Sequence, residues 1–135
     1  MKAIMLCIVT VVSCIFLSGC SLEGDAGAER EKLDFTIISE DRMPQELLEL
    51  LEGKKQDAFQ LTYTDEDYLY VCIGYGEQET GGYGISVKDF SLGDGAIYVD
   101  TLLIGPDSGN KDNKSPSYPY IVIKTEKREE QIIFN

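Results

Sequence analysis

From residue 33 onward the chain is divided into short apolar segments of strand length, and this pattern constrains the fold more than any other feature. Polar turn sequences separate the segments, and their close spacing favours antiparallel pairing. The segment at 68–76, YLYVCIGYG, carries apolar side chains on both of its sides, which is typical of a central strand covered on both faces. The expected strands are residues 33–39, 58–63, 68–76, 83–90, 96–105, 118–124 and 131–134.

One helix is expected between the first two of these strands. In residues 43–53, MPQELLELLEG, three leucines fall on one face at helical spacing, Leu47, Leu48 and Leu51, with Leu50 flanking that face. Pro44 suits the first helical turn, and Gly53 suits the left-handed position that follows a helix. The sequence therefore predicts an α+β fold, with one short helix packed on a small, curved antiparallel β-sheet. We expect that sheet to be a half-open barrel or sandwich-like.

The amino terminus resembles the signal of a bacterial lipoprotein. Lys2 precedes an apolar run over residues 3–16, which is shorter than the span of about 20 residues that crosses a membrane. The sequence LSGC at 17–20 then resembles a lipobox, in which the cysteine is lipidated and the chain is cut before it. This resemblance implies a signal peptide at 1–19, a lipid anchor on Cys20 and an extracytoplasmic position at a bacterial membrane.

The remainder divides into a tether and one domain. Residues 20–32 hold the lipidated cysteine and a small, charged segment without periodicity, which is typical of a flexible linker. Residues 33–135 have the length of a single domain. The net charge of −12 argues against binding to nucleic acid, because phosphate backbones select basic surfaces.

The composition removes the commonest catalytic chemistries. The chain contains no histidine, so Ser-His-Asp and Cys-His catalysis and the usual zinc sites are excluded. Cys72 is the one cysteine beyond Cys20, and its apolar neighbours predict a buried side chain rather than a reactive thiol. A hydrolase that uses two carboxylates is the least favoured class, because abundant acidic residues say nothing about geometry.

The polar loop at 107–117 carries oxygen-bearing side chains at intervals that resemble a calcium site: Asp107, Asn110 and Asp112. It lacks the glycine and the bidentate glutamate of an EF-hand loop, and two lysines oppose a cation there. The sequence predicts a solvated loop. We therefore expect neither a metal ion nor a cofactor.

Two further segments are candidates for function. Residues 80–83, TGGY, are followed by a strand rather than a helix, so they do not form a phosphate-binding loop. Gly81 and Gly82 instead predict a corner that needs positive φ or close backbone approach. Tyr118 and Tyr120 flank Pro119 after the polar loop, where an exposed tyrosine can contact a partner. The alternative is that both tyrosines belong to the core.

These segments carry a family resemblance. The TGGY corner, the GISV that follows it, and the later Pro-Tyr pair resemble the PrcB C-terminal domain family over residues 67 to 125. That family is named after a lipoprotein subunit of a surface protease complex. The resemblance implies a surface lipoprotein domain of accessory or unknown role, without catalytic residues. We expect this domain to bind another protein as an accessory subunit, with a secreted protease or other envelope complex as the candidate partner. The motif residues are expected to be structural: Thr80, Gly81, Gly82, Tyr83, Pro119 and Tyr120. The alternative function is a solute- or glycan-binding lipoprotein that uses Tyr118 and Tyr120.

Overall fold

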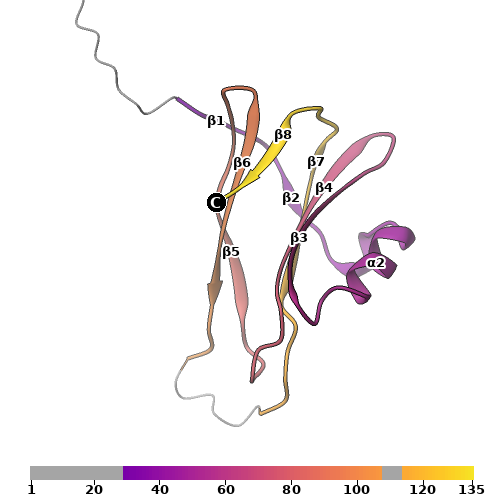
Figure 1. Ribbon diagram of the computed structural model, residues 1–135, viewed down its shortest axis with the longest axis vertical. Helices are drawn as coiled ribbons and strands as arrows, with labels where there is room; N and C mark the ends of the chain where they lie inside the picture. The colour runs from indigo at the N-terminus through magenta and orange to yellow at the C-terminus, as the bar shows by residue number, and fades with distance from the viewer. Residues whose placement is uncertain (1–28, 108–113) are drawn as a thin grey trace, which may run out of the picture.

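The computed structural model describes residues 29–107 and 114–135, and its elements stack in three layers (Figure 1). Sheet A has the strand order β1-β5-β6-β8, and sheet B has the order β2-β7-β4-β3. The helix α2 lies against the outer face of sheet B. The elements are β1 (Glu31–Lys32), β2 (Thr36–Ile37), a 3-10 turn η2 (Glu40–Arg42), α2 (Gln45–Glu52), β3 (Ala58–Thr64), β4 (Tyr68–Tyr75), β5 (Gly84–Gly93), β6 (Ala96–Ile104), β7 (Tyr120–Glu126) and β8 (Gln131–Phe134).

Strand β4 lies inside sheet B with both of its faces buried, as its apolar pattern predicted. Val71 and Ile73 point into the core between the two sheets. Tyr70 and Cys72 alternate with them and point toward the helix. Successive side chains of a strand face opposite sides, so a strand that is apolar at every position requires a covering layer on each side.

The helix covers sheet B through two of the three leucines that its spacing singled out, while the third, Leu48, is only half-buried. Leu47 and Leu51 are fully buried and pack against a cluster that includes Tyr70, Cys72 and Val122. The expectation for the helix end was wrong. Gly53 has φ −78° and ψ −13°, because the chain continues into a right-handed turn in place of a left-handed cap.

The expectation of one curved sheet is corrected to two open sheets, with no closed barrel among the described residues. The sheets face each other across a shared apolar core, so the sandwich-like alternative describes them best. The expected strand at 33–39 is the place where the chain changes sheets. The Leu33 N–H donates to the Phe90 carbonyl in sheet A (3.0 Å), and the Ile38 N–H donates to the Val122 carbonyl in sheet B (3.1 Å). Only Thr36–Ile37 remains as strand between these two attachments.

Both ends of the described chain join sheet A. Glu31 and Lys32, which the sequence assigned to the tether, form β1 and pair with β5. Beside them, the Arg30 guanidinium lies 3.1 Å from the Asp89 carboxylate and 3.7 Å from the centre of the Tyr98 ring. At the other end β8 runs parallel to β6, which corrects the expectation of a purely antiparallel sheet. A parallel direction is possible because β8 does not follow β6 through a hairpin. The chain first passes through β7 in sheet B and then returns to sheet A.

The signal sequence and Cys20 lie outside the described residues, so the predicted lipid anchor stays a prediction. Within the part of the chain that is described, no helix is long and apolar enough to cross a membrane.

Candidate protein-binding site

The TGGY corner joins the two ends of the polar loop. Gly82 has φ +86°, and a β-carbon placed on it would lie 2.9 Å from the Cβ atom of Pro106, where the loop starts. At the other end of the loop, the Ser117 hydroxyl donates to the Thr80 carbonyl over 2.7 Å. Positive φ is confirmed at Gly82 and is not found at Gly81. The corner therefore holds the two ends of the loop and fixes where the chain leaves it.

Backbone hydrogen bonds then guide the chain from the loop into β7. Gln78 and Ser117 form an isolated antiparallel bridge through bonds of 2.8 and 3.0 Å. The Tyr75 N–H donates to the Pro119 carbonyl over 3.0 Å. Because Pro119 is tied to the end of β4 and Ser117 to the segment that follows it, the side chain of Tyr118 between them is held in a defined position.

The structure separates the two tyrosines that the sequence proposed as partner contacts. Tyr120 is half-buried, packs against the cluster under the helix, and donates from its hydroxyl to Glu40 Oε1 over 2.6 Å. Burial and this carboxylate raise the pKa of the Tyr120 hydroxyl well above its usual value. Tyr118 is also half-buried, but its hydroxyl reaches outward to Glu77 Oε1 over 3.2 Å. Tyr120 is therefore part of the packed structure, and Tyr118 has the more accessible polar end.

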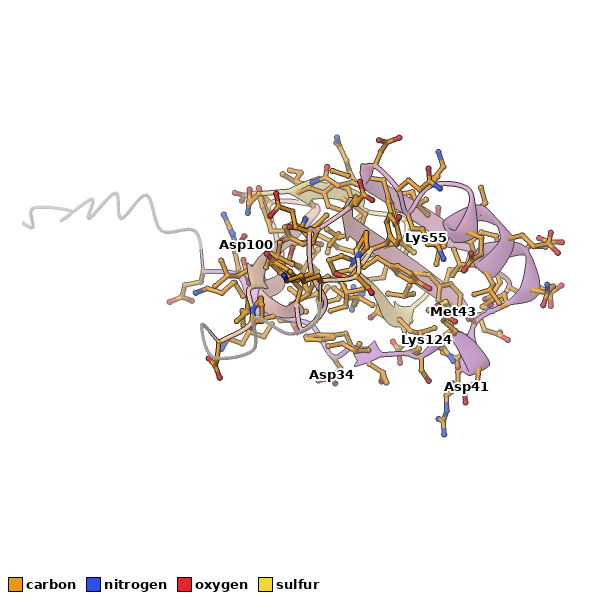
Figure 2. All side chains as sticks on the ribbon, turned by 90° about the horizontal axis from the view of Figure 1, so that it is seen from below. Asp34, Asp41, Met43, Lys55, Asp100 and Lys124 are labelled. Carbon is orange, nitrogen blue, oxygen red and sulfur yellow. The ribbon has the colours of Figure 1, made fainter. Side chains whose placement is uncertain are left out.

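Both tyrosines line one surface groove of about 340 Å³, which we call the Tyr118 groove. The opposite wall comes from the end of β2 and the segment after it, and it includes Ile37, which is 53% exposed. Figure 2 looks along the molecule from below and labels Met43, one of the lining residues, close to the helix layer. The lining residues are Ile37, Ile38, Ser39, Glu40, Met43, Tyr118, Pro119, Tyr120, Ile121 and Val122.

The Tyr118 groove also contains a free stretch of sheet edge. The Ile38 N–H donates to the Val122 carbonyl, so Val122 directs its backbone groups toward β2. In an antiparallel ladder alternate residues point the same way, and Tyr120 therefore points in that direction as well. The chain leaves the sheet after Ile38 and enters η2, so within the described residues Tyr120 is paired with β4 on one side and has no strand beside it on the β2 side. The groove thus offers backbone hydrogen-bonding groups next to apolar and aromatic side chains.

Sequence reasoning missed the wall of the groove that faces the tyrosines. Ile37 and Glu40 lie about 80 positions before Tyr118 and Tyr120, a separation that the Tyr120–Glu40 bond bridges. In the sequence Ile37 belongs to an ordinary strand pattern, and Glu40 is one acidic residue among many. No local signal joins them to the tyrosines, because the contact depends on how the chain crosses between the sheets.

Cys72 is buried, as its neighbours predicted, and burial raises the pKa of its thiol to about 12. We therefore expect that the folded protein at pH 8 reacts with iodoacetamide at Cys72 at least roughly a hundredfold more slowly than the unfolded protein, because the thiolate is the nucleophile. Mass spectrometry after timed labelling in buffer and in guanidinium chloride measures this ratio. Equal rates under the two conditions would contradict the buried position.

Potential metal ligands do not gather in the described structure: residues 29–107 and 114–135 contain no group of three or more Cys, Asp or Glu side chains arranged to hold an ion. Asp107 is exposed at the start of the polar loop. Asn110 and Asp112, the other residues with calcium-like spacing, lie outside the described residues.

Residues 69–126 of the chain match the PrcB C-terminal family. The match runs from β4 through β7 and includes the TGGY corner and the Pro119-Tyr120 pair, so the predicted resemblance is confirmed over this segment. Within the matched segment lie the TGGY corner, the two ends of the polar loop and one wall of the Tyr118 groove. No curated protein and no solved structure gave a significant match to the chain.

Proposed function

We propose that this protein is a membrane-anchored, extracytoplasmic lipoprotein whose domain binds another protein as an accessory subunit. The candidate partner is a secreted protease or another complex of the cell envelope. The observation that carries the proposal is the Tyr118 groove, which the PrcB C-terminal segment builds together with the chain around β2.

The groove has the features by which an extended peptide segment is bound. A peptide can add to a free strand edge through backbone hydrogen bonds, while nearby pockets receive alternate side chains. Here the edge is the backbone at Tyr120, and Ile37 and Tyr118 provide apolar and aromatic contacts beside it. Aromatic side chains with a polar tip are enriched among residues that dominate binding energy.

The charge around the groove indicates what the partner segment carries. Glu40 and Glu77 each accept a hydrogen bond from a tyrosine of the groove, and the whole chain has a net charge of −12. Opposite charges across an interface favour the right partner and speed association. The partner segment is therefore expected to be extended and to combine an apolar side chain with lysine or arginine.

The domain itself is proposed to have no catalytic activity. The chain lacks histidine, and the thiol of Cys72 is buried with its pKa raised to about 12. An accessory domain acts through the protein that it holds, so its effect is expected only in the presence of that partner. The proposal is tested by purifying the full, lipidated chain from native membranes and identifying proteins that accompany it in comparable molar amount. A chain that purifies alone and hydrolyses a substrate would contradict it.

The anchor is tested separately at Cys20. We expect Cys20→Ala to abolish lipidation, so that the protein leaves the detergent phase in phase partitioning or stays as an uncut precursor. Cys14→Ala is the matched control, since it removes a cysteine of the expected signal peptide and leaves the lipobox intact. Detergent-phase partitioning of Cys20→Ala identical to that of the unsubstituted chain would refute the lipoprotein assignment.

A further inference from the structure

Strand β3 forms a long edge of sheet B that nothing in the described structure protects. It runs over seven residues, Ala58–Thr64, and β4 is its one neighbour in the sheet. Proteins usually protect such an edge with a lysine, a proline or a bulge, because its free backbone groups can pair with another strand. The sequence AFQLTYT has no charge and no proline, and its pairing with β4 is regular throughout.

The phase of the β3–β4 ladder shows which backbone groups are free. The Asp65 N–H donates to the Tyr68 carbonyl over 3.0 Å, so Asp65 points toward β4. Alternate residues of an antiparallel strand share this orientation. The odd-numbered residues of β3 therefore direct their backbone groups to β4. The residues that direct theirs outward are Ala58, Gln60, Thr62 and Thr64.

We infer that β3 pairs with β3 of a second copy of this chain, antiparallel about a twofold axis at Leu61. This register matches all seven residues and brings outward-directed backbone groups opposite one another, with Gln60 facing Thr62 of the second copy. On the helix side, Phe59 faces Tyr63 of the second copy, and the two Leu61 side chains meet at the axis. Aromatic and aliphatic pairs of this kind stabilise neighbouring strands.

The side chains that would meet are incompletely covered in the single chain. Phe59, Leu61 and Tyr63 are half-buried, and they pack against the cluster beneath the helix along one side. The Tyr63 hydroxyl donates to Glu46 Oε2 over 2.9 Å, which fixes the ring in place. The edge is thus preorganised, and its remaining apolar surface is the surface that a second β3 covers.

Charges at the two ends of β3 are complementary under this pairing. Lys54 and Lys55 precede the strand, and the acidic turn 65–67 follows it. Antiparallel pairing places this end of each copy beside the acidic turn of the other. Lys54 is the exposed lysine there, since Lys55 Nζ lies 2.8 Å from Glu52 Oε2 of its own chain. Asp57 of one copy and Asp65 of the other also approach each other at this end. The negative charge of the Asp65 carboxylate is partly offset by the hydrogen bonds that it accepts from Asp67 N–H, Tyr68 N–H and the Tyr70 hydroxyl of its own chain.

The paired β3 edges leave the Tyr118 groove open. The strand order of sheet B places β3 and β2 at opposite edges, with β4 and β7 between them. The Tyr118 groove lies at the β2 edge. A dimer through β3 therefore presents two grooves, and it raises the avidity for a partner that carries two binding segments.

Disulfide trapping in the full chain, in its membrane, tests this register. In the proposed pairing Leu61 faces its own copy at a position where the Cβ atoms are close enough for a disulfide. We expect Leu61→Cys to give a disulfide-linked dimer under mild oxidation, at least roughly tenfold more than Thr64→Cys. Thr64→Cys is the matched control because Thr64 faces Ala58 of the second copy. Native Cys72 is buried and does not compete.

A proline variant tests the backbone pairing. Thr62→Pro removes an outward N–H and spares the bonds to β4, so it is expected to abolish the disulfide of Leu61→Cys while the unfolding temperature changes little. Cross-linking of Leu61→Cys at the level of Thr64→Cys, cross-linking to a different protein, or an unchanged yield with Thr62→Pro would each overturn the inference. If Leu61→Cys does not fold, the mass of the detergent-solubilised chain decides: a dimer that Thr62→Pro converts to monomer supports the pairing, and a monomer in both contradicts it.

Discussion

Replacing Gly82 with valine is expected to lower the free energy of unfolding by roughly 2–6 kcal/mol, because two costs of about 1–3 kcal/mol each act at this residue. The first is strain, since the backbone at Gly82 has φ +86°. The second is overlap, since a β-carbon would lie 2.9 Å from the Cβ atom of Pro106. A domain of this size has about 5–15 kcal/mol of stability, so the thermal midpoint is expected to fall by roughly 10 °C or more. Thermal unfolding of residues 21–135 measures the change.

Three alanine variants separate strain from overlap. Gly84→Ala adds a methyl group into open space at ordinary φ, and we expect little change or a slight stabilisation. Gly95→Ala also meets open space but at φ +76°, so it reports strain alone. Gly82→Ala combines both costs and should be the most destabilising of the three. An unchanged melt of Gly82→Val together with lost partner binding would show that the corner is a recognition loop.

Alanine at Tyr120 is expected to lower stability, whereas alanine at Tyr118 is expected to weaken partner binding. Tyr120→Ala removes a ring that packs against the cluster under the helix, so we expect a loss of roughly 2–3 kcal/mol of stability, somewhat below the cost of a fully buried aromatic ring. Tyr118→Ala removes a ring whose hydroxyl contacts only the exposed Glu77 carboxylate, and its melt should be nearly unchanged. Capture of the native partner by Tyr118→Ala is expected to fall at least roughly tenfold, the effect of losing one interface hot spot.

The phenylalanine variants are the matched controls. Tyr118→Phe keeps the ring, so it should retain most partner capture if the contact is aromatic. Tyr120→Phe keeps the packing but removes the bond to Glu40. A large loss of stability in Tyr118→Ala, with a proportionate loss of capture, would instead place Tyr118 in the core and remove it from the binding surface.

Local patterns in the sequence were sufficient for the individual elements. Alternation around Tyr70 and Cys72 predicted a strand covered on both faces, because each face of a strand reports its own environment. The spacing of Leu47 and Leu51 predicted the buried face of the helix. The short polar turn before β4 favoured antiparallel pairing of β3 and β4, and Asp65 closes that turn by accepting bonds from the backbone of Asp67 and Tyr68.

The assembly of those elements could not be read from the same patterns. The 33–39 segment has a continuous apolar pattern, yet Leu33 bonds to sheet A and Ile38 bonds to sheet B. The QIIF sequence of β8 is equally suited to parallel or antiparallel pairing. The Tyr118 groove depends on the first of these long-range choices, because the crossing between the sheets decides which segment lies beside Tyr120. For that reason the sequence identified the tyrosines and missed Ile37 and Glu40.

Photo-crosslinking at Ile37 tests the central claim, that the Tyr118 groove binds another protein, most directly. Ile37 lies in the groove and is 53% exposed, so a photoreactive amino acid there contacts whatever occupies the groove. Leu50 is the matched control, because it is 43% exposed on the helix and does not line the groove. The full chain is irradiated in native membranes, and the adducts are identified by mass spectrometry.

We predict one dominant protein adduct at Ile37, absent at Leu50 and strongly reduced when Tyr118→Ala is added. An adduct with a second copy of the chain would assign the groove to self-association. No protein adduct at Ile37, together with binding of the purified chain to a sugar or other solute, would contradict the account and favour the solute- or glycan-binding alternative.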